Sequence, residues 1–112
     1  MVNYKDPVEG VFSALANPTR RSILERLRSG SRSISALAEP FDMSLVAVSK
    51  HVHRLEEAGL VRIRREGRSR VCELDPGPLR VGRRWIDRFR HFWSDELNQI
   101  DRYLDASDET GD

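Results

Sequence analysis

The segment from residue 44 to residue 59 constrains the fold most, because both of its ends carry helix-boundary residues. Ser44 is a typical N-cap residue, whose hydroxyl accepts a hydrogen bond from an amide of the first turn. Gly59 stands where a residue with a left-handed backbone would end the helix. The segment therefore predicts a helix over 44–58, and its apolar stripe at helical spacing consists of Leu45, Val48, Val52 and Leu55.

The opposite face of this helix is small, polar and basic, and it carries no carboxylate before Glu57. Small side chains allow a close approach to a DNA duplex, and longer basic ones reach base edges or phosphates. We expect this face to enter a DNA major groove, although the pattern by itself also fits a solvated helix face. Its members are Val46, Ala47, Ser49, Lys50, His53 and Arg54.

Two helices are expected near the start of the chain. Asp6-Pro7 and Asn17-Pro18 each place a capping residue before a proline, which is a preferred arrangement at a helix start. The second helix ends at Ser29-Gly30, and its arginines are expected on the solvated side. Arg20 and Arg21, close to the helix start, are alternatively candidates for phosphate contacts.

A very short helix is expected after Ser33, which can act as its cap. Residues 39–42 then form a break before the helix at 44–58. A short helix, a brief turn and a longer helix with a polar outer face make a helix-turn-helix, in which the first helix braces the second across the groove.

The apolar period changes to two after Gly59, where Val61 and Ile63 alternate with arginines. A turn around Gly67 and a returning strand over 70–74 complete a two-stranded ribbon, or wing. Arginines on such a ribbon can follow phosphates or enter a narrow minor groove. The alternative is a solvated hairpin whose arginines serve solubility. The arginines at and beside the wing tip are Arg65, Arg68 and Arg70.

The segment from residue 79 to residue 104 carries apolar residues at spacings of three and four over about seven helical turns. One small domain cannot cover so much apolar surface, so we expect a second copy of the chain to cover it. The first helix is expected to contribute. The predicted dimer interface comprises Val8, Phe12, Leu15, Trp85, Phe89, Phe92, Trp93, Leu97 and Ile100.

Charge is segregated along the 112 residues, so the net charge of +1 says little about partners. A basic middle and an acidic end indicate a local anionic partner, here double-stranded DNA. The sequence predicts one domain over 1–104 and an acidic disordered tail over 105–112. It contains neither a signal peptide nor a long apolar run, so we expect a cytoplasmic protein with no membrane partner.

Three motifs in this order resemble the ArsR/SmtB family of winged helix-turn-helix bacterial regulators, over roughly residues 7–104. They are Ala-Asn-Pro-Thr-Arg-Arg-Ser-Ile-Leu at 16–24, Ser-Leu-Val-Ala-Val-Ser-Lys-His-Val at 44–52 and Leu-Val-Arg-Ile-Arg-Arg-Glu-Gly-Arg at 60–68. The resemblance implies a mainly helical fold with a small β-hairpin, and a homodimer joined through its terminal helices. It also implies a palindromic operator and, usually, repression of the protein's own operon. By position, the residues that match the family's DNA contacts are Ser44, Val46, Ala47, Ser49, Lys50, His51 and Arg68.

Founding members of that family release DNA when a metal binds, but this chain resembles the branch without the usual metal-site cysteines. Residues 33–38 contain no cysteine, and Cys72 is the only one in the chain. Asp87, His91 and Asp95 share a helix face, yet one imidazole per chain is a poor zinc site. We therefore expect no metal and no cofactor. Release by an unknown small-molecule inducer, by Cys72 oxidation or through protein level stays open.

The sequence favours a DNA-binding repressor over a winged-helix module that binds only protein, because the outer helix face and the wing are basic. An enzyme is not expected. Ser49, His51 and His53 share one helix without a paired carboxylate or a glycine-rich loop. Cys72 can lie on either face of its strand, and a lone cysteine in a strand is more often a small core residue than a sensor.

Overall fold

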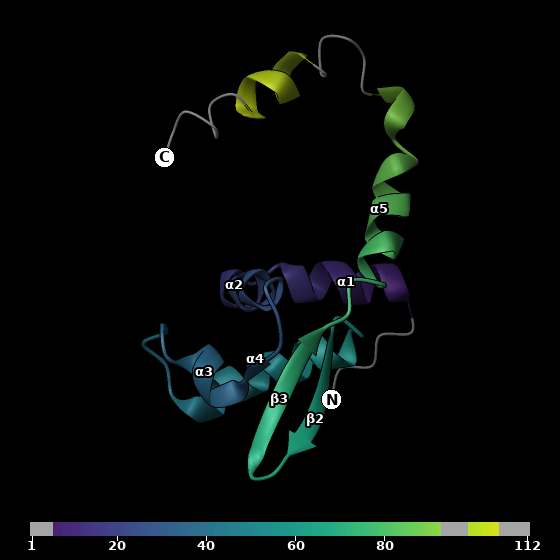
Figure 1. Ribbon diagram of the computed structural model, residues 1–112. Helices are drawn as coiled ribbons and strands as arrows, with labels where there is room; N and C mark the ends of the chain where they lie inside the picture. Colours follow the sequence, from purple (N-terminus) through teal and green to yellow (C-terminus); the bar gives the residue numbers. More distant parts are fainter. Residues whose placement is uncertain (1–5, 93–98, 106–112) are drawn as a thin grey trace. The chain divides into compact units, whose positions relative to one another are not determined.

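The computed structural model describes residues 6–92 and 99–105. These residues are mainly helical with one small sheet, and a β-hairpin follows the helix-turn-helix as predicted (Figure 1). The elements are α1 (Pro7–Leu15), α2 (Pro18–Leu27), β1 (Arg32–Ser33), α3 (Ile34–Ala38), α4 (Leu45–Glu57), β2 (Val61–Glu66), β3 (Ser69–Leu74), α5 (Leu79–Asp87) and the 3-10 turn η1 (Arg90–Phe92). Residues 99–105 are also helical.

The four helix starts are confirmed by their caps. The carboxylate of Asp6 accepts from the amide of Val8 at 3.0 Å, and the side chain of Asn17 accepts from two amides of α2. The hydroxyls of Ser33 and Ser44 each accept an amide hydrogen bond at 3.1 Å, from the third residue after them. Gly59, with φ of +77°, ends α4 in the left-handed region, as expected.

The core of the helix-turn-helix lies where α2, α3 and α4 meet the sheet. Val48, Val52 and Leu55 of α4 are fully buried there. Leu45 was predicted to join them, and this is wrong, because its side chain is 52% exposed. It stands in the first turn of α4, beyond the reach of the core, and lines a surface hollow instead.

The sheet has three antiparallel strands in the order β1-β3-β2. The hairpin of β2 and β3 was predicted, and Gly67 occupies its turn with φ of +61°. The strand β1 was not predicted, because two residues are too few to show an alternating pattern. Its pairing places Arg32 opposite Cys72, on the inner strand of the sheet. Cys72 is fully buried, which settles the question of its face and confirms a core position.

Two arginines of α2 do not lie on a solvated side, contrary to the sequence analysis. Arg20 donates from Nε to the carbonyl of Ala14 at 2.8 Å and from Nη2 to the carbonyl of Ser13 at 2.9 Å. Arg26 donates to the carbonyl of Leu37 at 2.8 Å. The last carbonyls of a helix lack partners within it, so these guanidinium groups complete the ends of α1 and α3.

The terminal segment is not one continuous α-helix. Within the described residues α5 ends at Asp87, and the amides of Arg88, Phe89 and Phe92 then bind carbonyls three residues back. Apolar residues spaced by three fit this tighter turn as well as an α-helix, so periodicity could not place the break. Residues 93–98, with Trp93 and Leu97, lie outside the described residues.

The chain divides into two compact units, Met1–Gly82 and Arg83–Asp112, and the first contains the whole helix-turn-helix and wing. Gly82, the last residue of the first unit, is buried where α5 begins. A Cβ there would lie 3.4 Å from Val11 and 3.6 Å from Phe12 of α1, so glycine allows the two helices to pack closely. In the residues that the structure describes, no helix is long and apolar enough to cross a membrane.

Candidate nucleic-acid interface

The outward face of α4 presents small and cationic side chains to solvent, with no carboxylate in the first turn. Ser44, Val46 and Lys50 are exposed. Although Val46 has an apolar side chain, 65% of its surface is open to solvent. Ala47 and Ser49 are half-buried beside them. This first half of α4 can approach a surface closely, with one flexible cation at its centre.

His51, which the resemblance places among the DNA contacts, lies at the edge of the core. Its ring is half-buried, and Nδ1 is 3.3 Å from Nη1 of Arg20. Burial, followed by the charges of Arg20 and Arg54, lowers the pKa of His51 below 6.5. Although His51 is among the predicted DNA contacts, its ring is therefore partly buried inside the protein, where the neutral form is favoured.

The second half of α4 is less open. His53 and Arg54 are both half-buried, and Nδ1 of His53 lies 3.3 Å from a carboxylate oxygen of Glu56. A carboxylate so near the basic face weakens the attraction of His53 for an anion. This pairing was not predicted, although the spacing of three residues on one helix indicates it.

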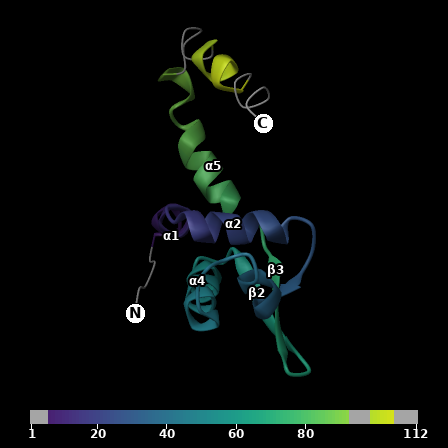
Figure 2. The same cartoon turned by 90° about the vertical axis from the view of Figure 1, so that its left-hand side faces the viewer.

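The wing contains two kinds of arginine. Arg64 pairs with Glu66 and with Glu73, each at 3.4 Å, and Arg62 pairs with Glu73 at 3.7 Å. The arginines named from the sequence behave differently: all three are exposed, and within residues 6–92 and 99–105 none of their side chains makes a hydrogen bond or an ion pair. They are Arg65, Arg68 and Arg70. The β2–β3 hairpin that carries them extends beyond α4 in both views (Figures 1 and 2).

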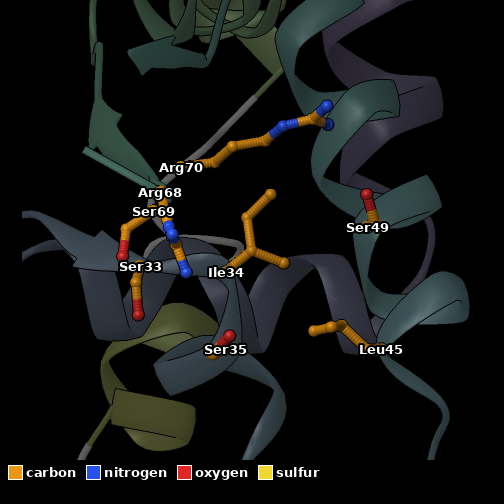
Figure 3. A pocket seen from close by; sticks show the side chains of 8 residues that line it. All are labelled: Ser33, Ile34, Ser35, Leu45, Ser49, Arg68, Ser69 and Arg70. Atoms are coloured by element: carbon orange, nitrogen blue, oxygen red, sulfur yellow. The ribbon is translucent and has the colours of Figure 1, made fainter. Parts of the chain in front are cut away.

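A hollow of about 270 Å³ lies between α3, α4 and the wing (Figure 3). Arg68 and Arg70 border it from the wing, Ser35 from α3, and Leu45 and Ser49 from α4. The sequence predicted Ser49, Arg68 and Arg70 as DNA contacts, and the structure brings these three to one place. It adds residues of α3, which no local pattern connects to a wing some 35 positions later in the chain.

The predicted dimer surface is split between the two units. Val8, Phe12 and Leu15 on α1 are half-buried in the first unit. In the second unit Trp85, Phe89 and Phe92 form an exposed aromatic row, with ring centres 4.9 Å and then 6.2 Å apart. Ile100 is also exposed. An exposed aromatic row is the kind of surface through which proteins bind other molecules.

In the part of the chain that the structure describes, the candidate metal ligands do not form a metal site. Asp87 lies 4.0 Å from Arg83, and Asp95 is outside the described residues. No group of three or more histidine, cysteine or acidic side chains is placed to hold a metal in the described ranges. Cys72 is buried, and burial, followed by the charge of Glu56, raises the pKa of its thiol to about 11.

Known transcriptional regulators are similar to this chain in sequence and in fold. A family model described as a helix-turn-helix domain matches residues 15–64. The transcriptional regulator Rv2034 of Mycobacterium tuberculosis is 38% identical over 106 residues, which cover 95% of each protein. A crystal structure of an ArsR family transcriptional regulator is similar with a TM-score of 0.74 and 40% identity, over 79% of this chain and 97% of that one. The solution structure of Mb0332 from Mycobacterium bovis, described as a homodimeric winged helix-turn-helix DNA-binding domain, has a TM-score of 0.62 and 30% identity, over 80% and 82% of the two chains.

Proposed function

Because this chain belongs to the ArsR family of winged helix-turn-helix transcriptional regulators, we propose that it represses transcription as a homodimer on a palindromic operator. One α4 helix enters the major groove in each half-site, and each wing lies on the flanking minor groove. A two-fold dimer places its two recognition helices in successive grooves on one side of the duplex, about 10 bp apart. A dimer bound to the operator then excludes RNA polymerase from the promoter. The repressed promoters include that of the protein's own operon.

The observation that carries this proposal is the distribution of unpaired cations. In the described part of the first unit, the side chains of Lys50, Arg65, Arg68 and Arg70 make no ion pair or hydrogen bond, whereas those of Arg62 and Arg64 are paired. These four cations lie on the outer face of α4 and on the wing. Phosphate contacts of this kind supply essentially all of the non-specific affinity of a DNA-binding protein and a large share of its specific affinity.

Base recognition is assigned to the open first half of α4. Ser44 and Ser49 can exchange hydrogen bonds with base edges or phosphates, and Ala47 leaves room for close approach. The exposed methyl groups of Val46 suit a thymine methyl group. His53 and Arg54 are placed to follow the strand beside the groove, and His51 contributes mainly by holding the helix.

The homodimer is assigned to the aromatic row of the second unit together with α1. The homodimeric state of the domain from Mycobacterium bovis supports this assignment. Since its target is chromosomal DNA, we place the protein in the cytoplasm. It needs no cofactor to bind, and a small molecule at the dimer interface is the proposed inducer.

The decisive experiment is the enrichment of DNA from random duplexes by the purified protein, followed by footprinting and salt titration. We expect an inverted repeat protected by two chains. K50A should then weaken binding and lower the salt slope by about one unit if Lys50 contacts a phosphate. R62A is a matched control, because Arg62 is engaged with Glu73 and its loss should change the slope little.

Two results would contradict the proposal. If no duplex is enriched at moderate salt, the chain is a winged-helix module that binds protein. If a single asymmetric site is protected by one chain, the dimeric operator is wrong. Binding by a K50A, R54A double variant as tight as that of the wild type would instead remove the assigned face of α4.

A further inference from the structure

The hollow between α3, α4 and the wing differs in charge from three other surface hollows of the first unit. Arg68 and Arg70 border it, and no aspartate or glutamate does. The neighbouring hollows each include a carboxylate, which is Glu56 beside the outer wing and Glu57 beside α1. An anion is therefore attracted to this one place without competition from an acidic side chain.

The wing holds its free charges in an arrangement that costs stability. Arg65 and Arg70 are directly opposite each other in the β2–β3 register. Like charges in directly opposed positions of an antiparallel pair repel and destabilise it. One position along β2, Arg64 is paired with Glu66 and Glu73, but the side chain of Arg70 has no such acidic partner among the described residues. An anion in the hollow would supply the missing countercharge.

Hydroxyl groups face the same hollow from two helices. Ser35 is exposed on α3 and Ser49 is half-buried on α4 (Figure 3). Each can donate a hydrogen bond to a phosphate oxygen, while a guanidinium group provides a two-pronged, charge-assisted contact. Ile34 and Leu45 give the hollow an apolar side, which suits the carbon atoms of a sugar.

We propose that this hollow receives one backbone phosphodiester of the operator, bound by Arg68 and Arg70 of the wing and by the hydroxyls of Ser35 and Ser49. The inference rests on the proposed function and adds α3 to the DNA contacts. A phosphate held there joins the wing to both helices of the helix-turn-helix. It thereby fixes the depth of α4 in the major groove, because the contact positions the protein on the duplex.

The test combines protein variants with single neutral methylphosphonates along the selected operator. For the wild type, one position per half-site should reduce affinity about tenfold. R70Q should cost about the same on unmodified DNA, and S35A about threefold. On DNA that is already neutral at that position, R70Q and S35A should each reduce the affinity by no more than about twofold. The methylphosphonate has already removed the contact, so the protein change cannot remove it again.

R64Q is the matched control, since Arg64 is an exposed wing arginine that is already paired with Glu66 and Glu73. Its effect should add to that of every methylphosphonate. The melting temperature of S35A should stay close to that of the wild type, because Ser35 is exposed. That of R70Q should be no lower than that of the wild type, because the change removes the repulsion between Arg70 and Arg65.

Three outcomes would overturn the inference. If the wild type selects an operator but no methylphosphonate position is coupled to both Arg70 and Ser35, the hollow is not a phosphodiester site, and the proposed function stands. If inorganic phosphate competes more strongly than chloride at equal ionic strength, and R70Q abolishes this, the occupant is a free anion. If the wild type selects no duplex at all, the proposed function fails together with the inference.

Discussion

Arg20 joins the end of α1 to the middle of the recognition helix, because its Nη1 lies 3.3 Å from Nδ1 of His51 while its other nitrogens bind the carbonyls of Ser13 and Ala14. The guanidinium group can only donate, so Nδ1 accepts and the ring is neutral. A helix assigned to the dimer and a helix assigned to DNA thus share one side chain.

We expect the stability of the protein to fall as the pH drops below about 6.5, with His51 contributing. Burial and the nearby arginines lower the pKa of His51 in the folded chain, so the unfolded chain binds a proton first. Acidification therefore favours unfolding. Urea titrations between pH 5 and 7.5 should show a smaller pH dependence for H51Q than for the wild type. H53Q is the control on the same helix, and an equal loss of pH dependence in H53Q would refute the assignment.

R20Q should destabilise the fold by about 1–3 kcal/mol, because it leaves carbonyls at the end of α1 without their charged donor. The matched control is R28Q, which removes only an exposed pair with Glu25 at 2.9 Å and should cost at most about 1 kcal/mol. Denaturant unfolding of both variants measures the difference. Equal losses would mean that Arg20 is no more structural than a surface arginine.

V46S should reduce affinity for the selected operator about fourfold, or about 0.8 kcal/mol, if its methyl groups meet one thymine methyl group. Replacing thymines by uracil one at a time in the operator identifies the partner base. At that base, the uracil and V46S effects should not add. Additive losses at every thymine would show that Val46 faces no methyl group.

Local chemistry explains what the sequence could predict. The caps at Asp6, Asn17, Ser33 and Ser44 depend on residues within three positions, and all four are confirmed. The roles that were missed depend on partners far along the chain. Arg26 binds carbonyls ten and eleven residues away, and the strand β1 exists only because β3 lies beside it. The assignment of DNA contacts stays a prediction for the same reason, since their partner is another molecule.

F89E should convert the dimer to monomers that bind DNA weakly, because a carboxylate in the middle of the aromatic row cannot be buried against a second copy. Sedimentation at micromolar concentration measures the assembly, and a gel shift measures the binding. R83A, an exposed change in the same unit, should leave the dimer intact. A wild type that sediments as a monomer would remove the claim.

Oxidation of Cys72 should not release the operator. The thiol is fully buried in β3, and its pKa of about 11 leaves almost none of it as the reactive thiolate at neutral pH. Alkylation by iodoacetamide should therefore be slow in the native protein and fast in urea, and hydrogen peroxide should leave the gel shift unchanged. C72A should bind the operator like the wild type. Release by stoichiometric peroxide that a thiol reverses, and that C72A abolishes, would make Cys72 the switch instead of the proposed small molecule.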